Sequence, residues 1–246
     1  MSAERLAELI AANQPCVVLT GAGVSTESGI PDFRSPSGVW AQFDPREYAT
    51  IHAFLADPAR VWEFYKRRFA MLKDARPNAA HEALAELERR GHVEAIVTQN
   101  IDRLHRLAGS QNVVEVHGSI ATCSCLDCGR SVPFDEVLAM VESAPAPACP
   151  DCGSILKPDV VMFGELLPVD AIARAAELAR SARLLLVVGS SLAVFPVGDL
   201  PQETLDAGGK LAIVNREPTP FDEEAAVVVH GPAGETLDAA RDHLLK

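Results

Sequence analysis

The chain of 246 residues has no hydrophobic run long enough to cross a membrane, no internal repeat and no low-complexity tract. It also lacks an excess of basic residues, since its formal net charge is −12. A duplex-binding protein needs a basic face that displaces counterions, so we expect no nucleic-acid partner. The lack of a membrane-length apolar run leads us to expect no membrane partner either. The first residues resemble a short amphipathic helix and not a signal peptide, so we expect a cytoplasmic protein.

Aromatic residues are scarce, at 5% of the chain, and most of them lie within residues 35–78, which we interpret as a helical insertion. Cysteines number six, and five of them lie between Cys123 and Cys152. Cys16 stands apart in an apolar run and is expected to be a buried small hydrophobe. In a reducing compartment, such a cysteine cluster favours a metal site over disulfides.

Six short apolar runs are typical of parallel strands that are covered on both faces. They span residues 17–20, 95–98, 113–116, 184–188, 211–214 and 227–229. Helical patterns such as residues 81–90 and 171–183 lie between several of them. This alternation predicts an α/β fold with a doubly wound, Rossmann-like parallel sheet.

Two segments interrupt the alternation and predict a second, smaller domain, helical plus zinc ribbon, formed by two insertions. We assign residues 35–78 and 119–157 to this small domain. The nucleotide-binding domain would then be discontinuous and comprise residues 1–34, 79–118 and 158–246. The cleft between the two domains is the natural place for a ligand.

Two Cys-x-x-Cys pairs, Cys125/Cys128 and Cys149/Cys152, are separated by twenty residues. This spacing matches tetrahedral zinc ribbons, and four thiolates leave no open coordination position. We therefore predict one structural Zn²⁺ rather than a catalytic one. Cys123 is a spare that could replace Cys125. The alternative, free thiols, would leave this loop-rich module without a cross-link.

Gly21-Ala22-Gly23 directly follows the first apolar run. Glycines at a strand end let a pyrophosphate approach the backbone, although such a pair alone is equally well explained as a tight turn. The dehydrogenase fingerprint requires a third small residue where Thr26 stands. Arg34, a few residues further on, can bind a phosphate or anchor the loop to a carboxylate.

Polar or small residues follow the other apolar runs as well. Gln99, Asn100 and Asp102 could hold a ribose or an amide, while Asn100 or Asp102 could equally be a helix N-cap. His117 titrates near neutral pH and suits a general base, although a lone histidine at a strand end is more often structural. The later runs are followed by Gly189, Ser190, Ser191 and Asn215. Because the carboxyl ends of parallel strands meet at one edge, these residues indicate a single nucleotide-sized ligand.

Taken in chain order, these blocks resemble the sirtuin family of NAD-dependent protein deacetylases and deacylases, over nearly the whole chain. Residues 157–165 and 213–215 extend the match. The resemblance implies NAD as a consumed co-substrate, one structural zinc ion and acylated lysine in proteins or peptides as the partner; we expect a monomer. The implied products are nicotinamide, O-acyl-ADP-ribose and free lysine, and the implied role of His117 is to take a proton from a ribose hydroxyl.

The resemblance also implies roles for individual residues. The catalytic residues would be His117, Asn100 and Asp102. The NAD site would comprise Gly21, Ala22, Gly23, Thr26, Phe33, Arg34, Gln99, Asn100, Ile101, Asp102, His117, Gly189, Ser190, Ser191, Asn215 and Ala233. The substrate peptide would be clamped as an added strand by Val161, Met162, Phe163, Gly164, Leu192 and Val194.

Tyr65 and Arg68 lie three residues apart in a helical pattern and therefore share one helix face. Arginine can bind a carboxylate bidentately, and the resemblance associates this pair with removal of succinyl or malonyl groups. The segment 30–34, in contrast, looks like the deacetylating members. We expect deacetylation as the main activity and desuccinylation or demalonylation as a secondary one. The alternative is that Arg68 belongs to a solvated helix face and Tyr65 to the core.

Three other functions compete with this interpretation. A dehydrogenase is disfavoured by the missing third glycine and by the lack of an acidic residue at the end of a second strand. A mono-ADP-ribosyltransferase shares the first chemical step and is excluded less firmly. A non-catalytic zinc-ribbon module would not explain polar residues at so many strand ends.

Overall fold

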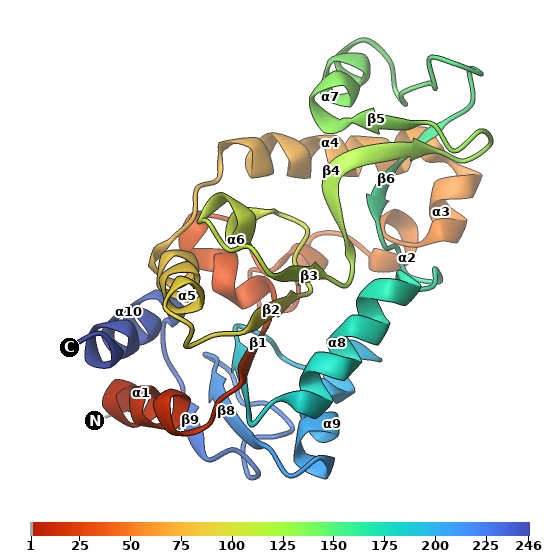
Figure 1. Ribbon diagram of the computed structural model, residues 1–246. Coiled ribbons are helices and arrows are strands. Elements are labelled where there is room, and N and C mark those ends of the chain that lie inside the picture. The colour runs from red at the N-terminus through yellow and green to blue at the C-terminus, as the bar shows by residue number, and fades with distance from the viewer. Residues whose placement is uncertain (1) are drawn as a thin grey trace.

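A six-stranded, wholly parallel sheet forms the centre of the larger lobe in the computed structural model, which describes residues 2–246 (Figure 1). Its strand order is β3-β2-β1-β7-β8-β9, the doubly wound arrangement. The strands are β1 (Cys16–Thr20), β2 (Ala95–Thr98), β3 (Val113–Glu115), β7 (Leu184–Val188), β8 (Lys210–Val214) and β9 (Val227–Val229). All six predicted strands are therefore confirmed.

Helices cover both faces of this sheet, which is why its strands are apolar throughout. On one face pack α1 (Ser2–Ala12), α5 (Ala79–Arg89) and α10 (Ala233–Leu244), and on the other α8 (Val169–Ser181) and α9 (Leu200–Asp206). Val18 points to the first layer, while Val17 and Leu19 point to the second. All three are fully buried, and each such side chain contributes about 1.5–3 kcal/mol of hydrophobic stabilisation.

The predicted helices begin and end close to their expected positions. The helix α5 starts at an N-cap, Asn78, whose side chain accepts from the Ala80 amide at 2.9 Å, and Gly91 with φ of 80° follows its end. Shorter elements occupy the connections at the carboxyl edge of the sheet. They are η1 (Ala22–Ser28), α6 (Leu104–Leu107) and η3 (Val197–Asp199).

The smaller lobe combines the two insertions. The first gives η2 (Val39–Ala41), α2 (Pro45–Tyr48), α3 (Ile51–Ala56) and α4 (Pro58–Asp74). The second gives β4 (Gly118–Cys125), β5 (Ser131–Pro133), α7 (Phe134–Ser143) and β6 (Leu156–Val160), with the antiparallel order β5-β4-β6. Phe69 of α4 packs edge-on against Phe134 of α7 with ring centroids 4.8 Å apart, so the insertions share one hydrophobic core.

The strand β6 crosses the boundary that we predict between residues 157 and 158. It pairs with β4 along its length, and the register Gly118↔Val160 shows that pairing continues to its last residue. The antiparallel ladder therefore continues three residues beyond the predicted boundary at residue 157, to Val160. No helix within residues 2–246 is long and apolar enough to cross a membrane.

Candidate active site

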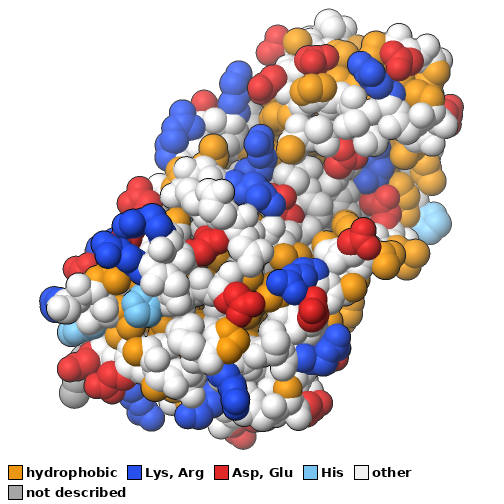
Figure 2. Space-filling view, viewed as in Figure 1, with side chains coloured by type: hydrophobic (Ala, Val, Ile, Leu, Met, Phe, Trp, Pro, Cys, Tyr) orange, Lys and Arg blue, Asp and Glu red, His pale blue; other side chains and the backbone are white. Residues whose placement is uncertain are grey.

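A cleft of about 1340 Å³ runs along the carboxyl edge of the parallel sheet and beneath the small lobe. Nearly every residue predicted for the NAD and substrate sites lines it, although they come from eight separate stretches of sequence. They are Gly21, Ala22, Gly23, Thr26, Phe33, Arg34, Tyr65, Arg68, Gln99, Asn100, Ile101, Asp102, His117, Val161, Met162, Phe163, Gly164, Gly189, Ser190, Ser191, Val194, Asn215 and Ala233. Around the cleft, positive and negative side chains are interspersed on the face seen in Figure 2.

Leu192 is the exception among the predicted substrate residues. Its side chain is 2% exposed and packs with Val17 and Val197 in the core beneath α8 and α9. Its φ of 55° is unusual for a leucine and turns the loop after β7 so that the side chain points inward. The structure therefore does not place the Leu192 side chain in the cleft.

The glycines after β1 and β7 pack against one another. The amide of Gly23 donates to the carbonyl of Gly189 at 2.8 Å, and a Cβ added at Gly23 would lie 2.8 Å from Gly189 Cα. At Gly189 itself φ is 61°, and a Cβ would lie 2.2 Å from the Val24 nitrogen. These glycines are thus required by the contact between two loops, in addition to forming a wall of the cleft.

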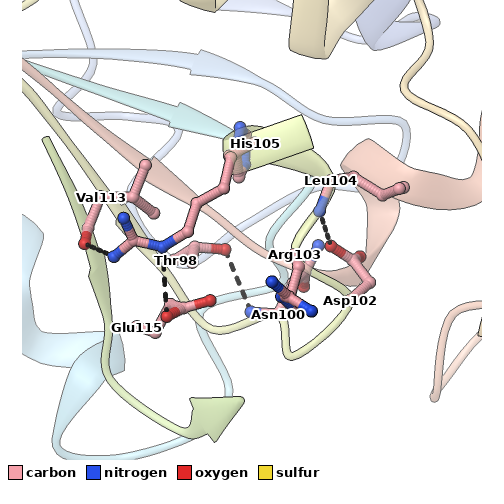
Figure 3. Close-up of a pocket in the computed structure, with 9 residues that line it drawn as sticks. Thr98, Asn100, Asp102, Arg103, Leu104, His105, Val113 and Glu115 are labelled. Carbon is pink, nitrogen blue, oxygen red and sulfur yellow. Dashed lines mark hydrogen bonds and ion pairs between the residues drawn. The ribbon is translucent and has the colours of Figure 1, made fainter. Parts of the chain in front are cut away.

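A tight turn after β2 orients the predicted ribose-binding residues (Figure 3). The Asn100 amide donates to Thr98 Oγ1 at 3.1 Å, and the Leu104 amide donates to Asp102 Oδ1 at 2.9 Å. Between them Arg103 adopts φ of 65° and takes the N-cap position of α6. Neither Asn100 nor Asp102 is therefore the N-cap residue, although Asp102 satisfies one of the helix's free amides.

Ser25 connects this turn to the glycine loop, and sequence reasoning did not assign it a role. Its hydroxyl donates to Asp102 Oδ2 at 2.7 Å and accepts from Asn100 Nδ2 at 3.1 Å. His81 Nε2 lies 3.4 Å from the same hydroxyl. Burial raises the pKa of Asp102, and the bonds to Leu104, Ser25 and Asn100 act in the opposite direction. The spacing of these residues along the chain gives no sign of the contact.

His117 is oriented by a backbone acceptor. Its Nδ1 lies 3.0 Å from the carbonyl oxygen of Gln99. Because a carbonyl can only accept, Nδ1 carries the proton and Nε2 has a free lone pair. Burial lowers the pKa of His117 and the nearby Arg34 cation lowers it further, while the bond to Gln99 opposes both. The imidazole is therefore neutral near pH 7, the form that a general base requires.

Gly118 fixes the chain immediately after the histidine. Its φ is 73°, and a Cβ there would lie 2.1 Å from the Asp159 carbonyl oxygen. The main chain of β4 can therefore approach β6 only with glycine at this position. Backbone packing between β4 and β6 therefore explains why a glycine follows His117 in the sequence.

The loop that carries Arg34 is held by a neighbouring carboxylate. Asp32 Oδ1 accepts from the amides of Arg34 and Ser35 at 3.1 and 2.9 Å. The guanidinium of Arg34 itself makes no ion pair or hydrogen bond within residues 2–246. Partial burial lowers its pKa, and Asp32 opposes that effect. An unpaired guanidinium at the wall of the cleft is suited to bind an anionic ligand group.

Tyr65 and Arg68 both line the cleft, on one face of α4. Burial raises the pKa of Tyr65 and lowers that of Arg68. Tyr65 is also part of the small lobe's hydrophobic core, so its packing and its position at the cleft coexist. No carboxylate within residues 2–246 pairs with Arg68.

The four predicted zinc ligands lie together at the tip of the small lobe. Their Sγ atoms are all within 4.8 Å of one another, and the pairs Cys125/Cys152 and Cys128/Cys149 are 3.5 and 3.6 Å apart. A tetrahedral zinc thiolate site with bonds near 2.3 Å places its sulfurs about 3.8 Å apart, so the cluster matches a zinc ion. Cys123 is buried in the core outside the cluster, and Cys16 is fully buried in β1, as predicted.

The model of the Sir2 family matches residues 21–196, most of the stretch that contributes to the cleft. The chain belongs to the Sir2 family. An NAD-dependent protein deacetylase of Caldivirga maquilingensis is 48% identical over 95% of this chain and 90% of its own length. An NAD-dependent protein deacylase of Pyrobaculum aerophilum is 47% identical over 94% of this chain and 92% of its own.

Solved structures of Sir2 enzymes share the whole fold of this Sir2-family chain. A Sir2 variant with a deacetylated p53 peptide and 3′-O-acetyl ADP ribose superposes with a TM-score of 0.95 at 40% identity, covering 98% of both chains. A Sir2 enzyme bound to a propionylated peptide superposes with a TM-score of 0.91 at 39% identity, again over 98% of both chains.

Proposed function

We propose that this Sir2-family chain removes acyl groups from lysine side chains of proteins or peptides and consumes NAD in the reaction. The observation that carries the proposal is the placement of His117: a neutral imidazole with a free Nε2 lines the same cleft as the glycine loop, the ribose-binding turn and the substrate segment. The products are nicotinamide, O-acyl-ADP-ribose and free lysine. The relatives named as NAD-dependent deacetylases and deacylases support this activity.

The two lobes have different roles in the proposed function. The NAD-binding domain comprises residues 1–34, 79–118 and 158–246, and the small helical and zinc-binding domain comprises residues 35–78 and 119–157. The pairing of β6 supports moving the last boundary to Val160. The substrate then lies where the lobes meet, so each domain contributes one wall of the site.

The chain's residues fit NAD as the co-substrate. The cleft is long enough to border five strand ends, and Arg34 offers an unpaired cation for the pyrophosphate. Ser190, Asn215 and Ala233 line the part of the cleft assigned to the adenosine. Bound NAD supplies the ribosyl group that accepts the acyl group as nicotinamide is released.

The catalytic residues act from the other part of the cleft. Asn100 and Asp102 hold the nicotinamide ribose, and Ser25 keeps both side chains in place through its three polar contacts. His117 takes the proton of a ribose hydroxyl at Nε2, while its bond to Gln99 preserves the tautomer that makes this possible. Burial of the site keeps this imidazole unprotonated before it acts.

The acylated peptide binds as an added strand between residues 161–164 and the loop after β7. Val161 N–H donates to His117 O at 2.9 Å, and Phe163 N–H donates to Ala49 O at 2.8 Å. Within residues 2–246 the Val161 carbonyl and the Gly164 amide have no partner, so they are available to an incoming strand. Val194, in the loop after β7, lines the same cleft.

The acyl pocket accepts an acetyl group and also tolerates an acidic acyl chain. We assign Tyr65 and Arg68, which line the cleft, to this pocket, since within residues 2–246 the Arg68 guanidinium has no carboxylate partner. We therefore assign deacetylation as the main activity, with desuccinylation or demalonylation as a secondary one. Zinc, held by the four cysteine thiolates, cross-links the small domain and takes no part in the chemistry.

The direct test is incubation with NAD and an acetyl-lysine peptide, following nicotinamide release and peptide mass together. Deacylation predicts one nicotinamide for each peptide that loses an acetyl group. A peptide that instead gains the mass of ADP-ribose would establish the transferase alternative. Reduction of NAD without nicotinamide release would establish the dehydrogenase alternative.

A further inference from the structure

An ion pair joins the two ends of residues 157–165, the segment that includes the proposed peptide-binding residues 161–164. Lys157 Nζ lies 3.0 Å from Glu165 Oε2, joining β6 to the residue that follows Gly164. The lysine is only 8% exposed, although it carries a charge. Lysine is almost never buried this far unless it is paired, so the contact indicates a specific role.

Three oxygen atoms surround the Lys157 ammonium. It donates hydrogen bonds to the carbonyls of Pro158 at 3.0 Å and Val160 at 2.9 Å, and it forms the ion pair with Glu165. The ammonium therefore contacts the backbone of β6 at two positions. A buried ammonium with such partners holds its surroundings in one geometry, because a rearrangement would leave its charge without them.

Glu165 acts on the other half of the segment. The same Oε2 atom that meets Lys157 accepts from the Met162 amide at 2.8 Å, and the Glu165 amide donates to the Met162 carbonyl at 3.0 Å. Gly164 permits this reversal with φ of 89°. Within residues 2–246 neither the Gly164 amide nor the Val161 carbonyl has a hydrogen-bond partner, and both residues line the cleft.

We propose that the Lys157–Glu165 ion pair is a positioning device that presents this backbone edge to the acyl-lysine peptide. The inference rests on the proposed function, since it concerns binding of that substrate. Neither charged group has to contact the peptide. Lys157 holds the end of β6 through two backbone carbonyls, and Glu165 accepts a hydrogen bond from the Met162 amide and so stabilises the turn. The pair thus sets affinity for the peptide, whereas the residues assigned to NAD lie on other loops.

The test compares steady-state constants for acetyl-lysine peptide and for NAD in wild type and three variants: Glu165→Ala, Lys157→Met and the double variant Lys157→Met/Glu165→Gln. Loss of the carboxylate is expected to raise the peptide KM about tenfold, because the amide edge is no longer held in register. The KM for NAD is expected to change less than about twofold. Arg174→Met, which breaks the exposed Arg174–Glu177 pair of α8, is the matched control and should leave both constants unchanged.

The double variant separates positioning from folding. Lys157→Met alone leaves the half-buried Glu165 carboxylate without its cation, whereas the double variant keeps an amide oxygen for Met162 N–H and carries neither charge. It should therefore recover part of the peptide affinity and of the thermal stability lost in Lys157→Met. Calorimetric titration of the acetyl-lysine peptide below each variant's melting temperature gives the affinity directly, even for a destabilised protein.

The inference is overturned if Glu165→Ala binds peptide within twofold of wild type, or if the KM values for peptide and NAD rise by the same factor in every variant. These outcomes differ from failure of the proposed function, in which wild type itself would release no nicotinamide from NAD and acetyl-lysine peptide. Active wild type with unaltered variants removes only the role of the ion pair.

Discussion

The guanidinium carbon of Arg68 lies 4.8 Å from the centre of the Phe33 ring, so a cation of the small lobe rests on an aromatic side chain of the loop that follows β1. Phe64 offers a second ring at 5.9 Å. Such contacts contribute about 0.5–1 kcal/mol at exposed sites and more when water is excluded. They hold the guanidinium at the wall of the cleft without neutralising it.

This geometry predicts how Arg68→Met alters acyl selectivity. The variant should lose most of its activity on succinyl- and malonyl-lysine peptides, at least about tenfold in kcat/KM, because a charge-assisted bidentate bond is removed. Deacetylation should be retained, since an acetyl group has no carboxylate to bind. The three peptides are compared at equal NAD concentration. Equal loss on all three would show that Arg68 is structural.

His117→Ala should nearly abolish deacylation while leaving NAD binding largely intact. Loss of a positioned general base typically lowers kcat by about two to four orders of magnitude. NAD affinity is measured by calorimetry and turnover by peptide mass. Near-normal turnover in this variant would rule out His117 as the base.

Acid should destabilise the fold through two buried histidines. Burial lowers the pKa of His81 to about 4 and that of His105 to about 3, whereas the unfolded chain titrates near 6.5. Between these values the unfolded state binds more protons, so the free energy of unfolding falls as pH falls below 6.5. Each histidine contributes a slope that approaches about 1.4 kcal/mol per pH unit well below pH 6.5, and about 1 kcal/mol between pH 6.5 and 5.5. Urea unfolding at pH 6.5 and 5.5 measures the slope, and His105→Asn should reduce it; an identical slope in the variant would contradict the assignment.

Zinc should be bound at one ion per chain. Cys125→Ser, Cys128→Ser, Cys149→Ser and Cys152→Ser should each lose the metal and loosen the small lobe, because metal binding contributes to its folding. Cys123→Ser, outside the sulfur cluster, is the matched control and should retain a full complement. Metal analysis of the purified variants measures the zinc content per chain and so identifies the ligands. Zinc retained in Cys125→Ser but lost in Cys123→Ser would show that the ligand set is wrong.

The parallel sheet was predictable because its strands are buried on both faces and therefore read as uninterrupted apolar runs. The residues that line the ligand edge of the sheet were also predictable. They are the polar or small residues that directly follow each apolar run, where parallel strands end at the ligand site. The zinc site was likewise predictable from the spacing of the cysteines. These features depend on short, local patterns.

Contacts between distant segments were not predictable in this way. Ser25 meets Asp102 and His81 only because three loops converge, and nothing in the local sequence marks that meeting. The packing of Gly23 against Gly189 is hidden for the same reason. The inward orientation of the Leu192 side chain is hidden as well, because its positive φ reverses the alternation that an extended loop would show. The ladder between β4 and β6, which continues to Val160, also depends on pairing between distant residues.

The inward turn of Leu192 bears on how many different proteins such an enzyme can serve. That side chain is committed to the core, and the Leu192 amide donates to Ser190 Oγ at 3.2 Å. Under the proposed function, a substrate strand beside the loop after β7 therefore meets no side chain at this position. We accordingly expect the enzyme to select the modified lysine and to accept diverse surrounding sequences.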